Sequence, residues 1–177
     1  GKTLIIDAHN TLYQFLSTIR APDGSLFSDS KGNITSHLIG LFGRTTNFLK
    51  QGIRPVFVFD GQRPELKQAE VSRRKELKQE AEELYAQAKE EGKTEEMKKY
   101  AARTSRLTKE MVTDAKLLLQ SLGIPVVQAP AEGEAQAAYM VKKGDGWAVA
   151  SQDYDSLLHE APRLVVNLSI TGKRRKG

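Results

Sequence analysis

Short apolar runs alternate along the chain with longer segments of helical periodicity. The apolar runs are rich in Val, Ile and Phe and are continuous, as expected of strands that are buried on both faces. They are residues 3–6, 55–59, 124–127, 147–150 and 164–166. Residues 34–49 and 107–122 carry apolar positions at helical spacing, and a glycine follows each of these segments. Strands that are separated by helices predict an α/β fold with a mostly parallel central sheet and right-handed crossovers.

The segment between about residues 63 and 109 has a different pattern. After Pro64 it lacks Gly and Pro as far as Glu91 and is rich in Glu, Lys, Gln and Ala, which predicts a long helix. Its few large apolar residues are too sparse for a helix in a core. Gly92 ends this helix, and Thr94 is a candidate cap for a second one. We therefore expect one domain, residues 1–177, whose core is formed by about 1–62 and 110–177 and whose helical arch stands off the sheet.

Acidic residues follow the predicted strands at the points where the strands end. They are Asp7, Asp60, Glu132, Glu134, Asp153 and Asp155. The carboxyl ends of parallel strands share one edge of a sheet, where active sites form. Two unit charges about 4 Å apart repel by roughly 1–4 kcal/mol, so such a cluster needs protons or cations to offset it. Because the chain has no cysteine, the donor set favours Mg²⁺ or Mn²⁺ over zinc.

Each of these acids also has a simpler interpretation. An Asp after a strand commonly caps the next helix, and Asp60-Gly61 is an ordinary turn pair. The recurrence at four strand ends favours a common site. Asp153 and Asp155 would share one side of an extended segment. Glu132 and Glu134 would diverge by about 200° in a regular helix, so they converge only if Glu132 precedes the helix.

Composition and charge narrow the class of protein. A length of 177 residues suffices for one domain with a hydrophobic core. The apolar runs are all shorter than the roughly 18–20 residues that span a membrane, and the chain does not open on a signal segment, so we expect no membrane partner and an intracellular location. The absence of cysteine is typical of a reducing compartment. The formal net charge of +5 favours a polyanionic partner.

The segments that contain these acids resemble the flap endonuclease (XPG-type) nuclease family, and most closely its archaeal members. They are IIDAHNTLYQFLSTIR, ITSHLIGLF, RPVFVFDGQRPELK, GIPVVQAPAEGEAQAAYM and ASQDYDSLL. Their combination spans nearly the whole chain and is specific, whereas FDG or DxD alone is not. The resemblance implies a PIN-like or resolvase-like nuclease core. It also implies an activity on branched DNA with a 5′ single-stranded flap, as a 5′ flap endonuclease and 5′–3′ exonuclease in DNA replication and repair.

The resemblance also implies a metal centre. The family holds two Mg²⁺ ions, for which Mn²⁺ may substitute, in seven carboxylates, and the six acids above match six of them. The seventh belongs to a segment beyond this chain's last residue, together with a helix-hairpin-helix-type element. A segment before Gly1 and a peptide that binds a sliding clamp are likewise expected in the full-length protein. The expected location is the nucleoid-associated cytoplasm of an archaeon or the nucleus of a eukaryote.

Basic and aromatic residues complete the expected site. In the family, Lys67 and Arg74 match catalytic residues of the arch that contact the scissile phosphate. Tyr13 matches an aromatic residue that stacks near the cleaved base, and Arg20 and Arg44 match residues near bound DNA. The remaining candidate DNA contacts are basic residues of the arch, namely Arg73, Lys78, Arg103 and Arg106. Independently of the family, Lys67, Arg74 and Lys78 would fall within about 40° of one another on a helix, which predicts a cationic stripe.

The chain departs from the family pattern at four places. Arg63 and Ala131 stand where Pro and Ser are usual, Gly43 replaces a Tyr, and His159-Glu160 replaces Phe-Gly. None of these positions matches a metal ligand. His9, two residues from Asp7, is a candidate to support the metal site from behind, and we expect His37 and His159 to be structural.

Two other functions stay open on the sequence. The first is a PIN-type ribonuclease, which would share the sheet and the carboxylates but has no need for a long basic arch. The second is a non-catalytic DNA-binding fragment that truncation has inactivated.

Overall fold

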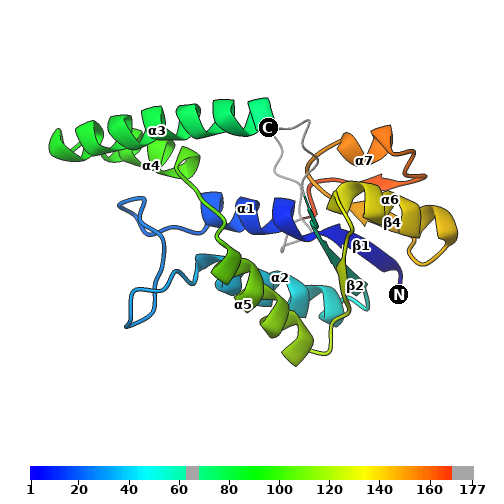
Figure 1. Cartoon of the computed structure of the whole chain (residues 1–177). Coiled ribbons are helices and arrows are strands. Elements are labelled where there is room, and N and C mark those ends of the chain that lie inside the picture. The colour runs from blue at the N-terminus through cyan, green and yellow to red at the C-terminus, as the bar shows by residue number, and fades with distance from the viewer. Residues whose placement is uncertain (63–67, 169–177) are drawn as a thin grey trace.

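The computed structural model describes residues 1–62 and 68–168. In these residues, five strands form one parallel sheet in the order β3-β2-β1-β4-β5 (Figure 1). The strands are β1 (Thr3–Asp7), β2 (Arg54–Phe59), β3 (Val126–Gln128), β4 (Ala148–Ala150) and β5 (Leu164–Val165). The predicted α/β fold with a parallel sheet is thus confirmed, and β1 lies at its centre.

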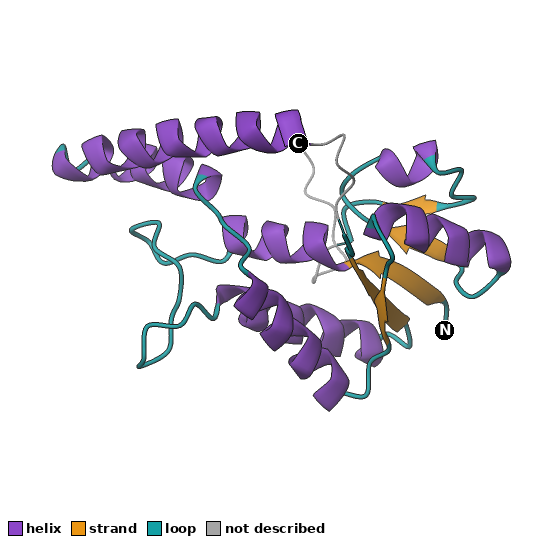
Figure 2. Cartoon of the chain, viewed as in Figure 1, coloured by secondary structure: helices purple, strands orange, loops and turns teal. Residues whose placement is uncertain are grey.

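Helices cover both faces of this sheet (Figure 2). Alternate residues of β1 enter two separate cores, because successive side chains of a strand point to opposite faces. Leu4 and Ile6 pack with apolar residues of α1 (Ala8–Thr18), α2 (Ser36–Lys50) and α5 (Lys109–Ser121). Ile5 packs on the opposite face with apolar residues of α6 (Gly133–Lys143). The short helix α7 (Asp155–Leu158) lies beside α6. The prediction of strands that are buried on both faces is therefore confirmed for β1, β2 and β4, whereas the edge strands β3 and β5 are only partly buried.

Strand β3 begins two residues later than predicted. Gly123, with a φ of +70°, ends α5 in the left-handed conformation. The Ile124 N–H then donates a hydrogen bond to the Leu119 carbonyl at 2.9 Å. Ile124 is therefore part of the end of the helix, and the ladder with β2 starts at Val126. The hydrophobic pattern alone does not distinguish an apolar residue at the end of a helix from one at the start of a strand.

The arch consists of two helices, α3 (Gln68–Glu90) and α4 (Thr94–Arg103), which pack against each other and extend away from the sheet (Figure 1). Small or flexible residues on these helices are buried: Ala81, Ala88, Met97 and Ala101. The helices thus bury a narrow face, which explains why large apolar residues are few. The expectation that Thr94 caps α4 is wrong, because Lys93 holds the cap position without a side-chain hydrogen bond and Thr94 is the first helical residue.

No helix in the described part of the chain is long and apolar enough to cross a membrane.

Candidate active site

The carboxyl edge of the sheet gathers the acidic residues that follow the strands. Asp7 is the last residue of β1, and Asp60 directly follows β2. Asp153 and Asp155 follow β4, and Glu132 and Glu134 lie at the start of α6, beyond β3. The strands that carry them are neighbours in the sheet, so the topology brings distant segments of the chain to one place.

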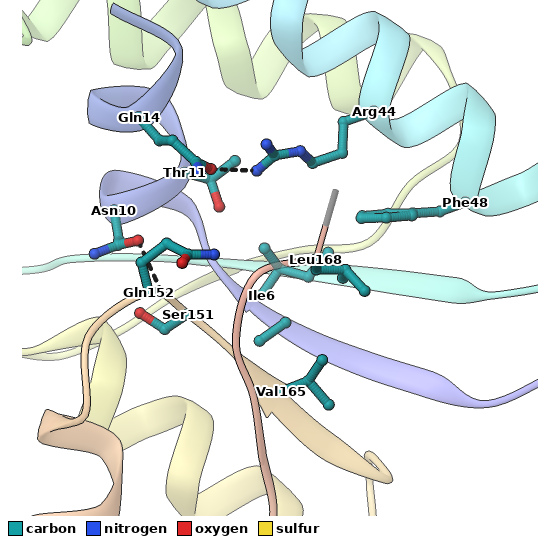
Figure 3. Close-up of a pocket in the computed structure, with 11 residues that line it drawn as sticks. Ile6, Asn10, Thr11, Gln14, Arg44, Phe48, Ser151, Gln152, Val165 and Leu168 are labelled. Atoms are coloured by element: carbon teal, nitrogen blue, oxygen red, sulfur yellow. Dashed lines mark hydrogen bonds between the residues drawn. The ribbon is translucent and has the colours of Figure 1, made fainter. Parts of the chain in front are cut away.

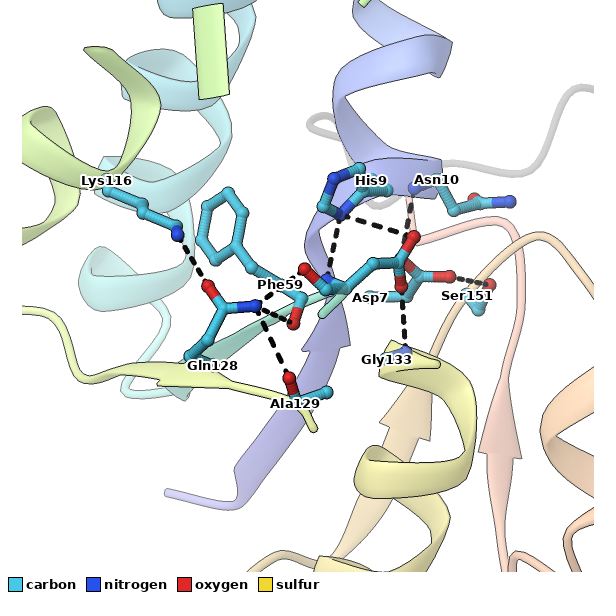
Figure 4. Close-up of polar contacts among 10 residues, drawn as sticks. Asp7, His9, Asn10, Phe59, Lys116, Gln128, Ala129, Gly133 and Ser151 are labelled. Atoms are coloured by element: carbon cyan, nitrogen blue, oxygen red, sulfur yellow. Dashed lines mark hydrogen bonds and ion pairs between the residues drawn. The ribbon is translucent and has the colours of Figure 1, made fainter. Parts of the chain in front are cut away.

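Asp7 is buried at the centre of this edge, with 3% of its surface exposed. One carboxylate oxygen accepts a hydrogen bond from the Asn10 N–H at 3.0 Å and thereby caps α1. The other lies 3.4 Å from the Ser151 hydroxyl, which donates to it (Figure 4). Burial, together with the charges of Asp60 and Asp153, raises the pKa of Asp7 to about 6 against the opposing effect of the Asn10 and Ser151 hydrogen bonds.

Asp60 is held by the start of α6 and by His9. Its carboxylate accepts a hydrogen bond from the Gly133 N–H at 2.8 Å. The Asp60 N–H donates to His9 Nδ1 at 3.1 Å (Figure 4). Because Nδ1 accepts this bond, its approach of 3.6 Å to the Asp60 carboxylate is not a second hydrogen bond of a neutral ring. His9 therefore fixes the backbone of Asp60, which favours the supporting role for which it was a candidate.

Gln128 is a further support that the sequence did not indicate. Its side-chain amide donates to the Asp60 carbonyl at 2.6 Å, and its oxygen accepts from Lys116 at the same distance (Figure 4). Residues of this kind leave no periodic or charge signal, because one amide near the end of a strand is ordinary.

Glu132 and Glu134 converge because Glu132 lies just outside helix α6. Glu132 precedes α6 in an extended conformation, with φ −82° and ψ 132°, and Glu134 lies in the first helical turn. The expectation that the first of the pair lies outside the helix is thus correct. Burial, together with the charges of Asp7, Asp155, Asp153 and Asp60, raises the pKa of Glu134 to about 7.

Asp153 and Asp155 reach the cluster by a different route from the predicted one. The segment after β4 is not extended: Asp153 lies in a bend, and Asp155 is the first residue of α7. The Asp153 N–H donates to the Ser151 hydroxyl at 3.1 Å, which holds the bend against β4. One ligand atom from each of Glu134, Asp153 and Asp155 lies within 4.8 Å of the other two.

A second group of possible ligand atoms includes a histidine. Ligand atoms of Glu132, Glu134 and His159 also lie within 4.8 Å of one another. His159 Nε2 is 3.7 Å from a Glu132 carboxylate oxygen. The proximity of His159 to the two glutamates was not predicted from the sequence, and the expectation that His159 is structural stays a prediction.

The candidate DNA contacts that the structure describes differ in their accessibility. Tyr13 is half-buried in α1, and Arg73 is exposed on α3. Arg106 pairs with Glu82 at 2.6 Å and ties the base of α5 to the arch. Lys67 lies outside the described residues, and so do the side chains of Arg74, Lys78 and Arg103.

Arg20 is occupied by protein contacts. Its guanidinium donates to the Leu16 carbonyl at 2.8 Å, the Gly24 carbonyl at 2.7 Å and the Ser105 hydroxyl at 2.8 Å. These bonds join the loop after α1 to the segment that leaves the arch. A role near DNA stays a prediction for this residue, whereas its structural role is explicit.

Arg44 borders a small hollow beside the acidic edge (Figure 3). Its Nη1 donates to the Gln14 side-chain oxygen at 2.6 Å, and its guanidinium lies 4.4 Å from the centre of the Phe15 ring. The hollow also takes in Asn10, whose side-chain oxygen accepts from the Gln152 N–H at 3.1 Å. Burial lowers the pKa of Arg44 from its usual value without removing its charge at neutral pH.

The carboxylates fit a hard divalent cation. Their donor atoms are oxygens, which Mg²⁺ and Mn²⁺ prefer. The raised pKa values of Asp7 and Glu134 show that negative charge at this edge is costly without a counter-charge. A bound cation would remove that cost, since it favours the ionised form of each ligand.

Comparison with protein families gives two matches that together cover most of the chain. The XPG N-terminal domain matches residues 1–81, and the XPG I-region matches residues 123–177. The chain belongs to the XPG family. The first match contains Asp7 and Asp60, and the second contains the other four acids of the candidate site, so both halves of the family signature meet at the carboxyl edge of the sheet.

The most informative relatives of this XPG-family chain are archaeal. It is 62% identical over 174 residues to Flap endonuclease 1 of Thermofilum pendens and 59% identical over 175 residues to that of Pyrococcus furiosus. These alignments cover 98% and 99% of the chain but only 50% and 52% of the relatives. The chain thus spans about half the length of the curated relatives it matches.

Solved structures give the same relationship. The flap endonuclease-1 from Methanococcus jannaschii superposes with a TM-score of 0.72 at 51% identity, over 98% of this chain and 55% of the other. The catalytic core of Rad2 in complex with DNA substrate superposes with a TM-score of 0.66 at 30% identity, over 99% of this chain and 45% of the other. The parallel sheet with its flanking helices is therefore the nuclease fold of these proteins.

Proposed function

We propose that the chain is the catalytic core of a structure-specific 5′ flap endonuclease and 5′–3′ exonuclease. It would hydrolyse DNA phosphodiesters at junctions between single-stranded and duplex DNA, in DNA replication and repair. The observation that carries this proposal is the convergence of Glu134, Asp153 and Asp155, whose ligand atoms lie within 4.8 Å of one another, in a chain of the XPG family.

Divalent cations are the cofactors that this donor set supports. Glu134, Asp153 and Asp155 would hold one ion, and Asp7, Asp60 and Glu132 would contribute the other carboxylates of this chain to a two-ion centre. Two Mg²⁺ ions, when bound, supply a water of lowered pKa and stabilise the oxygen that leaves. Mn²⁺ would substitute, because it prefers the same ligands.

The basic residues of the arch would act on the phosphate. Lys67 and Arg74 would neutralise the charge that builds on the phosphoryl oxygens, as preorganised electrostatic stabilisers. Tyr13, which is half-buried on α1, would orient the unpaired nucleotide by stacking. No histidine is required as a base in this scheme.

DNA is the partner that the chain's chemistry favours. The net charge of +5 and the exposed Arg73 on α3 suit a phosphate backbone that is bound without reading its sequence. The Rad2 core was solved with a DNA substrate, which supports the same partner here. A sliding clamp is a further partner that the full-length protein would bind, in an archaeal cytoplasm or a eukaryotic nucleus.

The test is a comparison of substrates with a matched variant. The chain is incubated with a 5′-flap DNA and with single-stranded RNA, with and without Mg²⁺, and its DNA affinity is measured separately. We expect cleavage of the flap DNA at the junction that requires Mg²⁺. Asp153→Ala should abolish this cleavage yet keep or improve DNA binding, because it removes negative charge near the phosphate.

Two outcomes would favour the other functions. Cleavage of the RNA alone would indicate a PIN-type ribonuclease. DNA binding without any metal-stimulated cleavage would indicate a non-catalytic DNA-binding fragment. Unchanged cleavage by Asp153→Ala would remove this residue from the metal centre.

A further inference from the structure

An imidazole faces the acidic edge at a position next to Glu132 and Glu134. His159 Nε2 lies 3.7 Å from a Glu132 carboxylate oxygen, and both side chains are partly shielded, with 37% and 24% of their surfaces exposed. Including Glu134, the three ligand atoms lie within 4.8 Å of one another. Ligands of one divalent ion at about 2.0–2.3 Å stand up to about 4–4.6 Å apart, so a small adjustment would let all three share an ion.

The fold presents these side chains from two adjoining elements. Glu132 and Glu134 flank the first residue of α6, and His159 directly follows the single turn of α7, which packs against α6. Glu134 belongs to both groups of ligand atoms, the one with His159 and the one with Asp153 and Asp155. Two cation positions that share Glu134 are therefore compatible with the geometry, one of them with a nitrogen donor.

We propose that His159 is a ligand of a divalent cation, together with Glu132 and Glu134. The inference rests on the proposed function to the extent that this edge holds a metal. It adds a mixed nitrogen and oxygen position to a centre whose other protein donors are oxygens. Mg²⁺ is bound through oxygen ligands and waters, whereas imidazole is a better ligand for transition-metal ions, which are softer than Mg²⁺. His159 would therefore raise the preference of this chain for Mn²⁺ over Mg²⁺.

A surface ion pair between His159 and Glu132 is the competing explanation. Such a pair requires a protonated ring and contributes little at a partly exposed site. Under the ion-pair explanation the protonated ring of His159 would repel a divalent cation, whereas under our proposal the ring coordinates it. Replacement of the ring should therefore weaken Mn²⁺ binding under our proposal and strengthen it under the ion-pair explanation.

Electron spin echo spectroscopy of the Mn²⁺-loaded chain distinguishes these cases, because it detects nitrogen bound directly to the ion. We expect ¹⁴N modulation from the parent chain and its loss in His159→Phe and in His159→Gln. Calorimetric titration should show a loss of Mn²⁺ affinity of about tenfold or more, as for other groups at metal centres, and a smaller loss for Mg²⁺.

Glu160→Gln is the matched control. Glu160 is adjacent in sequence, but its carboxylate pairs with Lys142, outside both groups of ligand atoms. This variant should keep the nitrogen modulation and both affinities. The two substitutions at His159 guard against a folding defect, since Gln keeps a polar side chain and Phe an aromatic one, and thermal melts verify that each is folded.

The results also separate this inference from the proposed function. Bound Mn²⁺ without nitrogen modulation, or modulation that persists in both His159 variants, overturns the role of His159 and leaves the nuclease proposal intact. A parent chain that binds no Mn²⁺ at all overturns both.

Discussion

Two carboxylates at the sheet edge, Asp7 and Glu134, ionise at a cost in free energy when no counter-ion is bound. Asp7 is buried, yet it accepts hydrogen bonds from Asn10 and Ser151, which favour its charged form. Burial prevails, and its pKa rises to about 6. Glu134 stands among four other acids and has a pKa of about 7. The folded chain therefore takes up protons at this edge that the unfolded chain has already released.

The pH dependence of stability follows from these two groups. Their pKa values rise from 3.8 to about 6 for Asp7 and from 4.5 to about 7 for Glu134. Between about pH 4 and pH 7 the folded state binds more protons than the unfolded state, so the free energy of unfolding should fall as pH rises. Asp7 alone corresponds to at most about 3 kcal/mol, and the contribution of the half-buried Glu134 is smaller than its shift suggests.

Urea unfolding in EDTA between pH 4.5 and pH 7.5 measures this effect. Asp7→Asn combined with Glu134→Gln should flatten the slope, and Mg²⁺ should restore the stability of the parent chain near neutral pH. Exposed carboxyls such as Asp29, whose pKa is lowered by hydrogen bonds from Asn33, act in the opposite sense but equally in both chains. A slope that is the same in the parent and the double variant would contradict the assignment.

The sequence predicted the identity of the clustered acids better than their local geometry. The position of Glu132 before its helix followed from helical periodicity alone. The geometry of Asp153 and Asp155 could not be predicted. It depends on the hydrogen bond from the Asp153 N–H to the Ser151 hydroxyl after β4, and no sequence pattern indicates this bond. The proximity of His159 to Glu132 and Glu134 was not predicted, because these residues are distant in sequence and become neighbours only through the packing of α7 on α6.

At the scale of elements, the site depends on a close joint between the end of β2 and the loop that leads from β3 to α6. Gly61 donates its N–H to the Ala131 carbonyl at 2.6 Å. A Cβ at Gly61 would lie 2.1 Å from the Ala129 carbonyl oxygen, which is part of the backbone and has no room to move. This joint sets the positions of Asp60 and Glu132 together.

Gly61→Ala should therefore lower the free energy of unfolding by more than about 2 kcal/mol, as overpacking does, and weaken Mg²⁺ binding. Gly43→Ala is the control, because it adds the same methyl group where no atom lies within 4 Å, inside α2. It should leave metal binding unchanged and stabilise the helix by about 0.5–1 kcal/mol. Chemical denaturation and calorimetric Mg²⁺ titration of both variants measure these effects. A Gly61→Ala variant that is as stable as the parent would show that the backbone around Gly61 moves to accommodate the methyl group.

The order of strands and helices could be read from the sequence because buried strands and amphipathic helices have different hydrophobic periods. The boundaries were less predictable. Ile124 looks like a strand residue, yet a left-handed Gly123 places it in the end of α5. The α3–α4 pair was predicted to stand off the sheet because large apolar residues are few, but the pattern did not identify the alanines that it buries, such as Ala81 and Ala88.

For the whole molecule, the arch is joined to the core by specific side chains. The Arg20 guanidinium links α1 to Ser105, which follows α4, and Arg106 links the same segment to Glu82 on α3. These contacts tie the segment after α4 to the end of α1 and to the middle of α3. The start of α3, at Gln68, follows Asp60 closely in the sequence. The basic residues at that start are thus close in sequence to a ligand of the proposed metal centre.

Lys67→Ala tests whether the arch takes part in chemistry. Its proposed contact strengthens in the transition state, so the single-turnover rate on a 5′-flap DNA should fall by about 100-fold, while the DNA affinity changes little. Lys93→Ala removes a cation at the distal turn of the arch, where Lys93 pairs with Glu91, and should change neither quantity appreciably. A loss of affinity without a loss of rate would make Lys67 a phosphate contact only.

The central claim is that acids from separate segments meet around divalent cations. Anomalous diffraction from crystals of the chain grown with Mn²⁺ measures this directly. We expect a manganese peak bounded by the carboxylates of Glu134, Asp153 and Asp155, with ligand distances of about 2.1–2.3 Å. Crystals that diffract well, contain Mn²⁺ in the medium and show no anomalous peak at this edge would contradict the account.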